Sequence, residues 1–289
     1  MTQEGAAASE PAPENFLRRL GQAGEGPHDI AQAALMLSAL DHPGKNLAPY
    51  RAHLSELAEA AKTVIGKMAD IEAAARALSG VIAGRYGYDG ERLAFDNAAN
   101  ADMISVIERR RGLPVILGIL YIHAARAAGM ESAGLYSPGH FLLRVARKGN
   151  DAVIDAFNAG AVLDRSRMTV PGIASPGPIP ISDARLGDEP SPFDPVTDTD
   201  VLLRVLNNIR GRAIQAKEIA RAAEIAGRMT LIAPGRPLIW LELARAQESL
   251  GSLSAAKASY DNAVKTSRPG DPFRNEAALA LNALKRRLN

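Results

Sequence analysis

The stretch "VILGILYIHAARAAG", residues 115–129, is apolar almost all round and ends at a glycine. A helix without a polar face offers no side to water, so this pattern predicts a helix buried in the protein core. Gly118 lowers the helix propensity by about 1 kcal/mol relative to alanine. Such a glycine is tolerable where another backbone packs close to it, so we expect a close contact at this position.

The residues that follow change from a helical to an extended pattern. The short apolar runs "SAGLYS", "HFLLRVAR" and "DAVIDAF" are separated by "PG" and "KGND", and the latter suits a hairpin turn. A buried helix that leads into a small antiparallel sheet is an α+β arrangement. The chain before it, from about residue 28 to 84, shows helical spacing, with Asp29 as a candidate N-cap. Asp102 similarly predicts a short helix that runs through Arg110.

The two ends of the chain give different patterns. Residues 1–27 are predicted to be a disordered tail, because the first fifteen are small, polar and acidic and lack the features of a signal peptide. Residues 165–200 hold seven of the 18 prolines, which predicts a linker or an extended segment wrapped on the surface.

Residues 201–289 are helical in pattern and contain an internal similarity. "APGRPLIW" and "RPGDPFRN" place proline, glycine and proline at positions 35 residues apart. A period near 34 is typical of tetratricopeptide repeats, in which small residues let paired helices approach and aromatic residues fill the gaps. An unrelated α-hairpin is the alternative. The positions that fit the repeat are Trp240, Leu243, Ala244, Ala256, Tyr260 and Ala263.

Composition excludes several classes of function. The formal net charge of the 289 residues is only +2, which argues against a dedicated nucleic-acid surface. The apolar runs are too short to span a membrane, so we expect a cytoplasmic protein. Cysteine is absent, and therefore a disulfide, a thiolate zinc site and a cysteine nucleophile are excluded. No cofactor and no metal site is predicted.

Three ordered elements of the middle segment carry a family resemblance. "RRRGLPVILGILYIHAARAAGM", "SPGHFLLRV" and "DAFNAG" together resemble the SirB family of transglutaminase-like proteins. The helical N-terminal third and the C-terminal repeats also fit the layout of that family. The matching residues are Arg110, Arg111, Gly112 and Pro114, then Pro138, Gly139, His140 and Phe141, then Asp155, Phe157 and Gly160.

The resemblance implies a papain-like core with a three-residue site. In that fold a cysteine begins the buried helix, while a histidine and an aspartate on neighbouring strands activate and orient it. His140 and Asp155 lie where the base and the orienting residue belong. The cysteine position falls at or beside Pro114, which carries no nucleophile but suits the first turn of a helix. The catalytic chemistry of the parent fold therefore does not transfer.

Three interpretations of His140 and Asp155 remain open. The pair could be a remnant that specifies the sheet, a site for a peptide or ligand, or an altered catalytic site. Glu108 is a third candidate, since it precedes the buried helix and could face the same cleft. The alternative for Glu108 is a surface charge paired with an arginine. Neither Ser105 nor Ser137 occupies the position of the nucleophile.

Other conspicuous side chains favour structural roles. In the triplet Arg109, Arg110 and Arg111, we expect one arginine in a buried ion pair and the others in solvent. His123 lies in the middle of the buried helix and is interpreted as a packed core histidine. His28, His42 and His53 show no metal-ligand spacing.

The sequence thus predicts a transglutaminase-like domain over residues 28–164, the proline-rich segment over 165–200 and a tetratricopeptide-like module over 201–289. The predicted function is non-catalytic binding of a protein or peptide, through the cleft or the helical repeats. The alternative is a hydrolase of altered mechanism that uses His140 and Asp155, with Glu108 as a further candidate.

Overall fold

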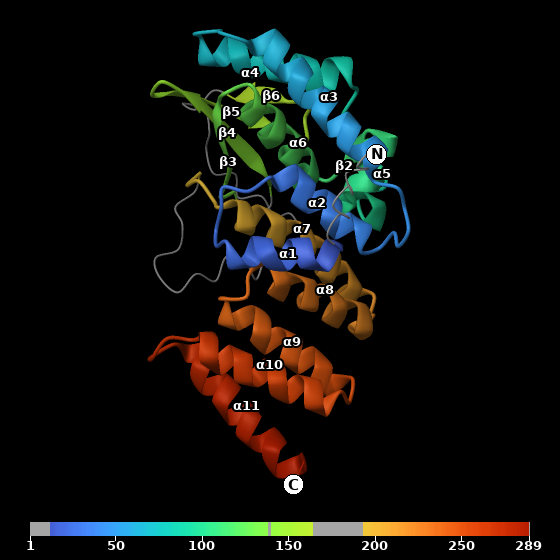
Figure 1. The fold of residues 1–289 in the computed structure, drawn as a ribbon, viewed down its shortest axis with the longest axis vertical. Coiled ribbons are helices and arrows are strands. Elements are labelled where there is room, and N and C mark those ends of the chain that lie inside the picture. The colour runs from blue at the N-terminus through green and yellow to red at the C-terminus, as the bar shows by residue number, and fades with distance from the viewer. Residues whose placement is uncertain (1–11, 138–139, 164–192, 289) are drawn as a thin grey trace, which may run out of the picture.

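The computed structural model describes residues 12–137, 140–163 and 193–288 (Figure 1). A small sheet with helices around it occupies one end of the molecule, and a set of helices occupies the other. The α-helices are α1 (Pro13–Gln22), α2 (Ile30–Ala39), α3 (Ala48–Ile65), α4 (Ile71–Ser79), α5 (Met103–Arg109), α6 (Pro114–Ala127), α7 (Asp198–Gln215), α8 (Ile219–Ile232), α9 (Pro237–Ser249), α10 (Leu253–Thr266) and α11 (Pro272–Leu288).

The strands form two separate pairings. β1 (Asp89–Gly90) and β2 (Arg111–Gly112) make a short parallel contact. The main sheet is an antiparallel meander in the order β3–β4–β5–β6. Its strands are β3 (Glu131–Leu135), β4 (Leu142–Arg147), β5 (Asn150–Asp155) and β6 (Ala161–Leu163). A π-helical turn, η1 (Gly80–Arg85), extends α4, and a 3-10 turn, η2 (Ala98–Ala101), precedes α5.

The hairpin predicted at "KGND" is confirmed. Arg147 pairs with Asn150, and the two residues between them, Lys148 and Gly149, both have positive φ, at 50° and 83°. A two-residue hairpin loop of this kind matches the right-handed twist of its strands. The predicted α+β class, a buried helix packed on an antiparallel sheet, is therefore what the chain adopts.

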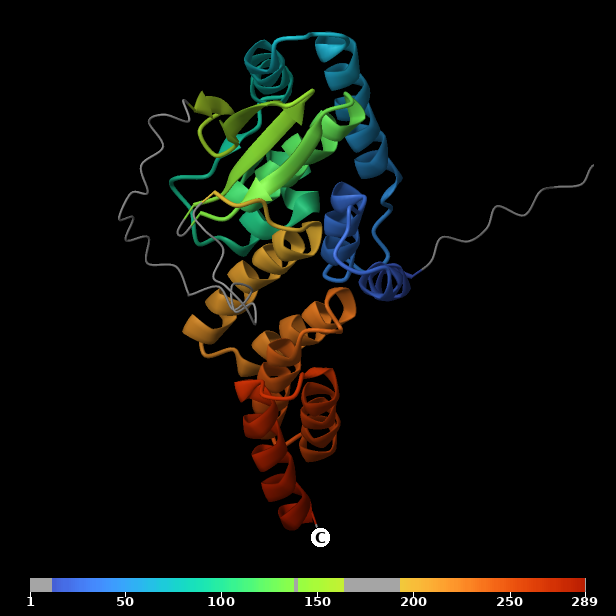
Figure 2. The ribbon, with the colours of Figure 1, turned by 90° about the vertical axis from the view of Figure 1, so that its left-hand side faces the viewer.

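Helix α6 is buried almost completely, as its sequence predicts, and it packs on one face of the sheet (Figure 2). The predicted N-caps are also in place: the Asp29 side chain accepts a hydrogen bond from the Gln32 N–H, and Asp102 accepts one from the Ser105 N–H. A smaller apolar cluster lies on strands β3 to β5, where Leu135, Leu142 and Val153 pack with Leu163 and Phe193.

The free edge of β3 is covered by the chain itself. The N–H of Tyr136 donates to the carbonyl of Asp194 at 2.8 Å, and the N–H of Phe193 donates to the carbonyl of Tyr136 at 2.7 Å. Pro195 forms an isolated bridge with Leu135, a position that needs no donor from the proline. The last part of the proline-rich segment therefore pairs with the sheet, while residues 164–192 lie outside the described residues.

The prediction of a disordered tail over residues 1–27 is wrong for residues 13–22, which form α1. Leu17 and Leu20 are buried in the main core, and α1 packs on α8 (Figure 1). The apolar positions of this helix are only three residues apart within a charged stretch, so a composition-based argument overlooks them. Glu25 is ordered as well, since it accepts hydrogen bonds from Thr197 and Arg236.

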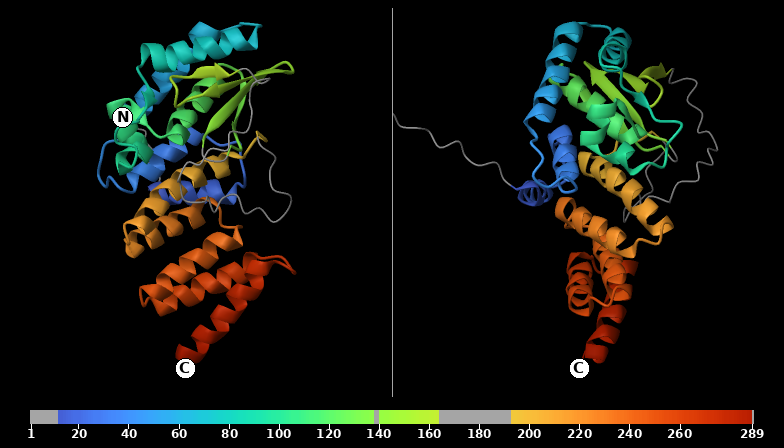
Figure 3. Two further views of the ribbon diagram at one scale, coloured as in Figure 1. Left: turned by 180° about the vertical axis from the view of Figure 1, so that it is seen from behind. Right: turned by 90° about the vertical axis from the view of Figure 1, so that its right-hand side faces the viewer.

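Two hydrophobic cores organise the helices. The larger core runs from α1 through the sheet to α7 and α8 and includes Ile239 of α9. The smaller core joins α9, α10 and α11, which form a layer of their own beyond α7 and α8 (Figure 3). The predicted start of the repeat module at residue 201 thus falls inside the larger core. Within the part of the chain that the structure describes, no helix is long and apolar enough to cross a membrane.

Candidate functional site

The beginning of α6 and the sheet are held together by a phenylalanine. Pro114 opens α6 at its first position, where the missing N–H costs nothing. A Cβ atom on Gly118 would lie 2.2 Å from the ring of Phe141, and one on Gly134 would lie 2.9 Å from it. The close contact expected at Gly118 exists, but it is made by this side chain rather than by backbone. Phe141 is 1% exposed and packs the start of β4 against α6.

His140 directly precedes this phenylalanine, at the point where a turn leads into β4. Its N–H donates to the carbonyl of Ser137 at 3.3 Å. Its own carbonyl accepts a hydrogen bond of 2.6 Å from Arg204 of α7, which also donates to the Ser137 carbonyl. Pro138 and Gly139 of the same motif lie outside the described residues. The backbone of His140 is therefore fixed on two sides.

Asp155 ends β5 and begins a tight turn. Its Oδ1 accepts hydrogen bonds from the backbone N–H groups of Phe157 at 3.0 Å and Asn158 at 3.2 Å. Its Oδ2 accepts one from the Asn158 side chain at 2.6 Å. Burial by itself would raise the pKa of the Asp155 carboxyl, but the hydrogen bonds from His140 and Asn158 outweigh it, and the pKa lies below its ordinary value. The carboxyl is thus held ionised.

His140 and Asp155 form the pair that the sequence predicts. The His140 Nε2 lies 2.9 Å from the Asp155 Oδ2, with the two side chains 22% and 8% exposed. Because Asp155 is ionised and can only accept, Nε2 carries the proton. In the neutral ring Nδ1 then keeps its lone pair. This is how an aspartate orients a histidine that acts as a base or as a hydrogen-bond acceptor.

The element Asp-x-Phe-x-x-Gly gains a physical explanation from this turn. The ring of Phe157 lies edge-on to His140, with centroids 6.5 Å apart. A Cβ atom on Gly90 would lie 2.5 Å from Phe157, so only glycine fits there. Gly160 has a φ of 72°, and a Cβ atom on it would meet the Tyr121 hydroxyl at 2.2 Å. Asp155, Phe157 and Gly160 of "DAFNAG" therefore each either contact His140 or close the turn against its neighbours.

The arginine triplet is distributed differently from the prediction. Arg110 has a left-handed backbone and stacks on the ring of Tyr88 at 4.7 Å. Its guanidinium hydrogen-bonds the Tyr88 hydroxyl and lies 2.5 Å from the Nε2 of His53. Burial and the neighbouring arginine hold the pKa of His53 below its ordinary value. Within the described part of the chain, Arg110 therefore contacts the neutral side chains of Tyr88 and His53 instead of forming the expected buried ion pair. Arg109 and Arg111 are exposed.

Glu108 does not join His140, and the expectation of a shared cleft is wrong. It lies on α5 and accepts hydrogen bonds from Lys45, at 2.8 Å, and from Tyr50 of α3. Its side chain is 50% exposed. The alternative of a surface charge is correct in kind, although the partner is a lysine. The helix phase at the end of α5 turns Glu108 toward α3 and away from the sheet.

The remaining candidates have structural partners. The Nε2 of half-buried His123 lies 3.1 Å from the carbonyl of Leu54, in agreement with a packed histidine. Neither Ser105 nor Ser137 has its hydroxyl bonded to His140 in the described residues. Those residues also contain no group of three or more His, Asp or Glu side chains that could hold a metal ion.

Sequence reasoning missed three residues that support the pair. Asn158 bonds the Asp155 carboxylate, and Arg204 bonds the backbone of His140. Arg92 donates to the Phe157 carbonyl at 2.9 Å and to the Asn158 side chain at 3.1 Å. Asn158 lies within the recognised motif and so could have been found. Arg92 and Arg204 are more than 60 residues from the turns they hold, and only the fold brings them there.

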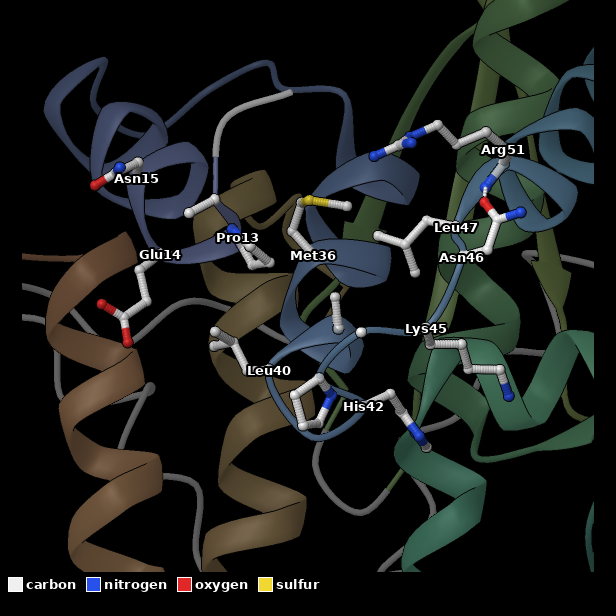
Figure 4. Close-up of a pocket in the computed structure, with 15 residues that line it drawn as sticks. Pro13, Glu14, Asn15, Met36, Leu40, His42, Lys45, Asn46, Leu47 and Arg51 are labelled. Carbon is white, nitrogen blue, oxygen red and sulfur yellow. Dashed lines mark hydrogen bonds between the residues drawn. The ribbon is translucent and has the colours of Figure 1, made fainter. Parts of the chain in front are cut away.

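A cavity of about 760 Å³ lies elsewhere in the molecule (Figure 4). The start of α1, the end of α2, the loop 42–47 and the start of α3 line it. Met36, Leu40 and Leu47 give it an apolar floor, and Lys45 and Arg51 lie at one end. None of the residues around the His140–Asp155 pair lines this cavity, so it is separate from the candidate site.

A buried helix on an antiparallel meander, with a histidine and an aspartate paired at neighbouring strands, defines the class: a papain-like core. Comparison with known proteins agrees, since residues 48–207, more than half of the chain, match the family described as "Transglutaminase-like superfamily". The chain belongs to the transglutaminase-like superfamily. The matched region extends into α7, the helix that carries Arg204.

Several relatives are similar over part of the chain. A "UPF0162 protein" of Xylella fastidiosa (strain Temecula1) is 28% identical over 175 residues, 60% of each chain. A "UPF0162 protein" of Vibrio cholerae is 25% identical over 152 residues, 52% of this chain and 56% of that protein. The human "F-box only protein 21" is 33% identical over 82 residues, which is 28% of this chain and 13% of that protein. The chain thus spans about 60% of the length of the first of these relatives. No solved structure matches.

Proposed function

We propose that the chain is a non-catalytic, SirB-type member of its superfamily that binds a peptide or a partner protein. One observation carries the proposal: the His140–Asp155 pair is complete, while the chain contains no cysteine for it to activate. Pro114 at the start of α6 supplies no nucleophile either. A base and its orienting carboxylate without a nucleophile can still hold a ligand by hydrogen bonds.

The geometry around the pair suits a peptide. The lone pair of the His140 Nδ1 can accept a hydrogen bond from a peptide N–H. Phe157 beside it offers an aromatic surface, and aromatic side chains supply much of the binding free energy in protein interfaces. Asp155 already accepts four hydrogen bonds, so its role is to hold the imidazole rather than to bind the ligand directly.

We propose further that α7 to α11 form a tetratricopeptide-type module that adds a second binding surface. The residues that fit the repeat pattern pack as it requires: Ala244, Ala256 and Ala263 are 0% exposed, and Tyr260 is 2% exposed. The starts of α9 and α11, Pro237 and Pro272, repeat after 35 residues. Helix pairs stacked in this way present extended surfaces to partners.

The experiment is a joint assay of turnover and binding on the full chain. Labelled-amine transfer and amide hydrolysis are measured together with photo-crosslinking to a labelled random peptide pool. We expect no turnover, and we expect crosslinking that falls at least tenfold in His140→Ala. His123→Ala is the matched control, because it removes a half-buried histidine from the same domain and is expected to leave crosslinking unchanged.

Two results would contradict the proposal. Acyl transfer or amide hydrolysis that disappears in His140→Ala would show that the site is catalytic. Crosslinking that is equal in wild type and His140→Ala, with both proteins folded, would show that the peptide does not bind at the pair. Deletion of residues 237–289, which removes the smaller core, tests whether the helical module contributes to the same binding.

A second candidate function is a hydrolase of altered mechanism. The ionised Asp155 and the Nε2–H···Oδ2 bond leave Nδ1 of His140 as a general base that could take a proton from water. A screen of ester and amide substrates would support this function if a turnover is found and disappears in His140→Ala. Loss of turnover in Glu108→Gln would not be expected, since Glu108 lies on a different surface.

A further inference from the structure

An aromatic path leads from His140 to the surface of the molecule. Phe157 lies edge-on to His140, and Phe95 of the loop 91–97 lies edge-on to Phe157, with centroids 6.1 Å apart. Phe95 is 45% exposed and its neighbour Leu93 is fully exposed. Two large apolar side chains of one short loop are therefore presented to solvent beside the candidate site, which is a feature of interaction surfaces.

The end of α7 places a poorly compensated cation against this loop. The guanidinium of Arg212 lies over the ring of Phe95 at 5.8 Å, and its Nη2 donates to the Phe95 carbonyl at 3.0 Å. Its Nη1 is buried and has no hydrogen-bond partner among the residues that the structure describes. The carboxylate that neighbours it is Asp96, 3.9 Å from Nε, and the Asp96 side chain is 94% exposed. Burial lowers the pKa of Arg212, and the distant carboxylate opposes this only in part.

A buried cation with incomplete hydrogen bonding destabilises the folded protein. A buried charge requires a paired and hydrogen-bonded partner, and an unsatisfied buried donor destabilises the folded state. Arg228 of α8 shows how the same fold satisfies a buried arginine, because Asp41 and Glu224 both accept from it. Arg212, with a side chain that is 16% exposed, has no equivalent pair of acceptors within residues 12–137, 140–163 and 193–288. An unsatisfied cation beside an exposed aromatic ring marks a site that a ligand completes.

The same helix also contacts the pair. Arg204 lies eight residues before Arg212 on α7 and donates to the carbonyl of His140. Arg92, on the other side, lies over Phe157 at 5.0 Å, but its charge is already paired with Asp89 at 3.0 Å. Of these arginines, Arg212 is therefore the one whose geometry calls for an additional carboxylate.

We propose that Arg212 and Phe95 form a subsite for an acidic peptide, in which an Asp or Glu carboxylate pairs with the guanidinium and an adjacent apolar side chain packs on Phe95 and Leu93. This inference rests on the proposed peptide-binding function and names the class of peptide. Asp96 competes for the same cation, so it weakens the binding of an acidic ligand.

The test compares two labelled peptide pools on the full chain by fluorescence anisotropy. Both are nine-residue pools with amidated C-termini and a central Leu or Phe; one carries a neighbouring Glu and the other a Gln in its place. A charge-assisted hydrogen bond contributes about 1.5–3 kcal/mol, so we expect the Glu pool to bind about 10- to 100-fold more tightly. Arg212→Gln is expected to abolish this preference and Arg212→Lys to keep part of it. Asp96→Asn is expected to strengthen binding of the Glu pool severalfold.

Arg85→Gln is the matched control, since Arg85 stacks on Tyr86 at 5.2 Å and lies outside this subsite. It is expected to leave the preference unchanged. Equal affinity of the two pools for the wild type overturns the inference while peptide binding itself stands. Binding of neither pool overturns the proposed function and the inference together. If Arg212→Gln does not fold, as circular dichroism would show, the wild-type preference and the Asp96→Asn effect decide, and the absence of either overturns the inference.

Discussion

The pair His140–Asp155 at the sheet and the pair Asp41–Arg228 between α2 and α8 are built from similar chemistry but end differently. Both have carboxylates whose pKa lies below the ordinary value, because side-chain hydrogen bonds outweigh the effect of burial: from Arg228 and Arg221 to Asp41, and from His140 and Asn158 to Asp155. Asp41 accepts from both Nη atoms of Arg228, at 2.6 and 2.7 Å, and from Arg221 at 2.8 Å. Glu224 completes the partners of Arg228. At the sheet, by contrast, the His140 ring keeps one nitrogen with a lone pair.

The two pairs differ in how many of their hydrogen-bonding atoms already have partners. Among charged hydrogen-bonded pairs, perturbed pKa values alone do not distinguish a structural clamp from a functional site. A clamp such as Asp41–Arg228 uses its donors and acceptors to join two helices. The His140–Asp155 pair holds a side chain in one orientation, and within the described part of the chain no hydrogen bond engages the second nitrogen of that ring.

The largest effect is expected from Arg228→Ala. The Arg228 side chain is 7% exposed, and its loss removes the buried partner of Asp41 and Glu224 and leaves them the partly exposed Arg221. Removing one partner of a buried pair costs about 3–5 kcal/mol, and because Asp41 is 30% exposed we expect a loss of about 2–3 kcal/mol in the free energy of unfolding. Urea denaturation measures it. Arg221→Ala, at the exposed side of the same carboxylate, should lose less than about 1 kcal/mol, and equal losses would contradict the clamp.

Two glycines test whether the helices of the two regions differ in packing. Gly118→Ala in α6 places a Cβ atom 2.2 Å from Phe141, and overpacking costs about 1–3 kcal/mol against a gain in helix propensity of about 1 kcal/mol. We expect a net loss of up to about 2 kcal/mol and weaker peptide binding, since Phe141 adjoins His140. Gly227→Ala in α8 meets open space and should raise stability by about 0.5–1 kcal/mol. The same sign in thermal denaturation of both variants would refute this account.

The fold of the site region follows from local signals in the chain. The all-round apolar pattern of α6, the turn "KGND" and the caps Asp29 and Asp102 each specify a local structure that the tertiary fold then uses. The His140–Asp155 contact could also be anticipated, because a tight turn brings the two strands side by side. These features depend on residues within about fifteen positions of one another.

The parts that escaped prediction depend on contacts distant in sequence. Helix α1 is buried through α8, more than 190 residues away, and its own pattern is too short to show this. Arg204 reaches His140 from α7, and Arg212 reaches Phe95 across 117 residues. Glu108 was placed at the site because it lies close to α6 in the chain, but the helix phase of α5 turns it to α3. Side-chain direction at the end of a short helix requires the tertiary fold.

A smaller effect on stability is expected when the pH is lowered. A carboxyl whose pKa is lowered in the folded state stabilises the protein at pH values above its unfolded pKa of about 3.9, and this contribution is lost as the pH falls through the folded pKa. Asp41 and Asp155 both belong to this class. The wild type should therefore lose stability as the pH falls below about 4, and Asp41→Asn and Asp155→Asn should each flatten that decline. Urea titrations at pH 2.5 to 6 measure it; unchanged curves in both variants would contradict the assignment.

The smallest effect on stability and binding is expected from Glu108→Gln, and a small effect is what separates this exposed pair from the candidate site. Glu108 bonds Lys45 and Tyr50 on the surface between α5 and α3, and exposed pairs contribute little to stability. If the functional site is defined by the unused nitrogen of His140, this substitution should leave crosslinking of the peptide pool within error of the wild type. A tenfold fall in crosslinking, with the melting temperature unchanged, would instead place Glu108 in the binding site. It would also show that the ligand contacts the surface between α5 and α3, and a binding site confined to the His140–Asp155 pair would then be wrong.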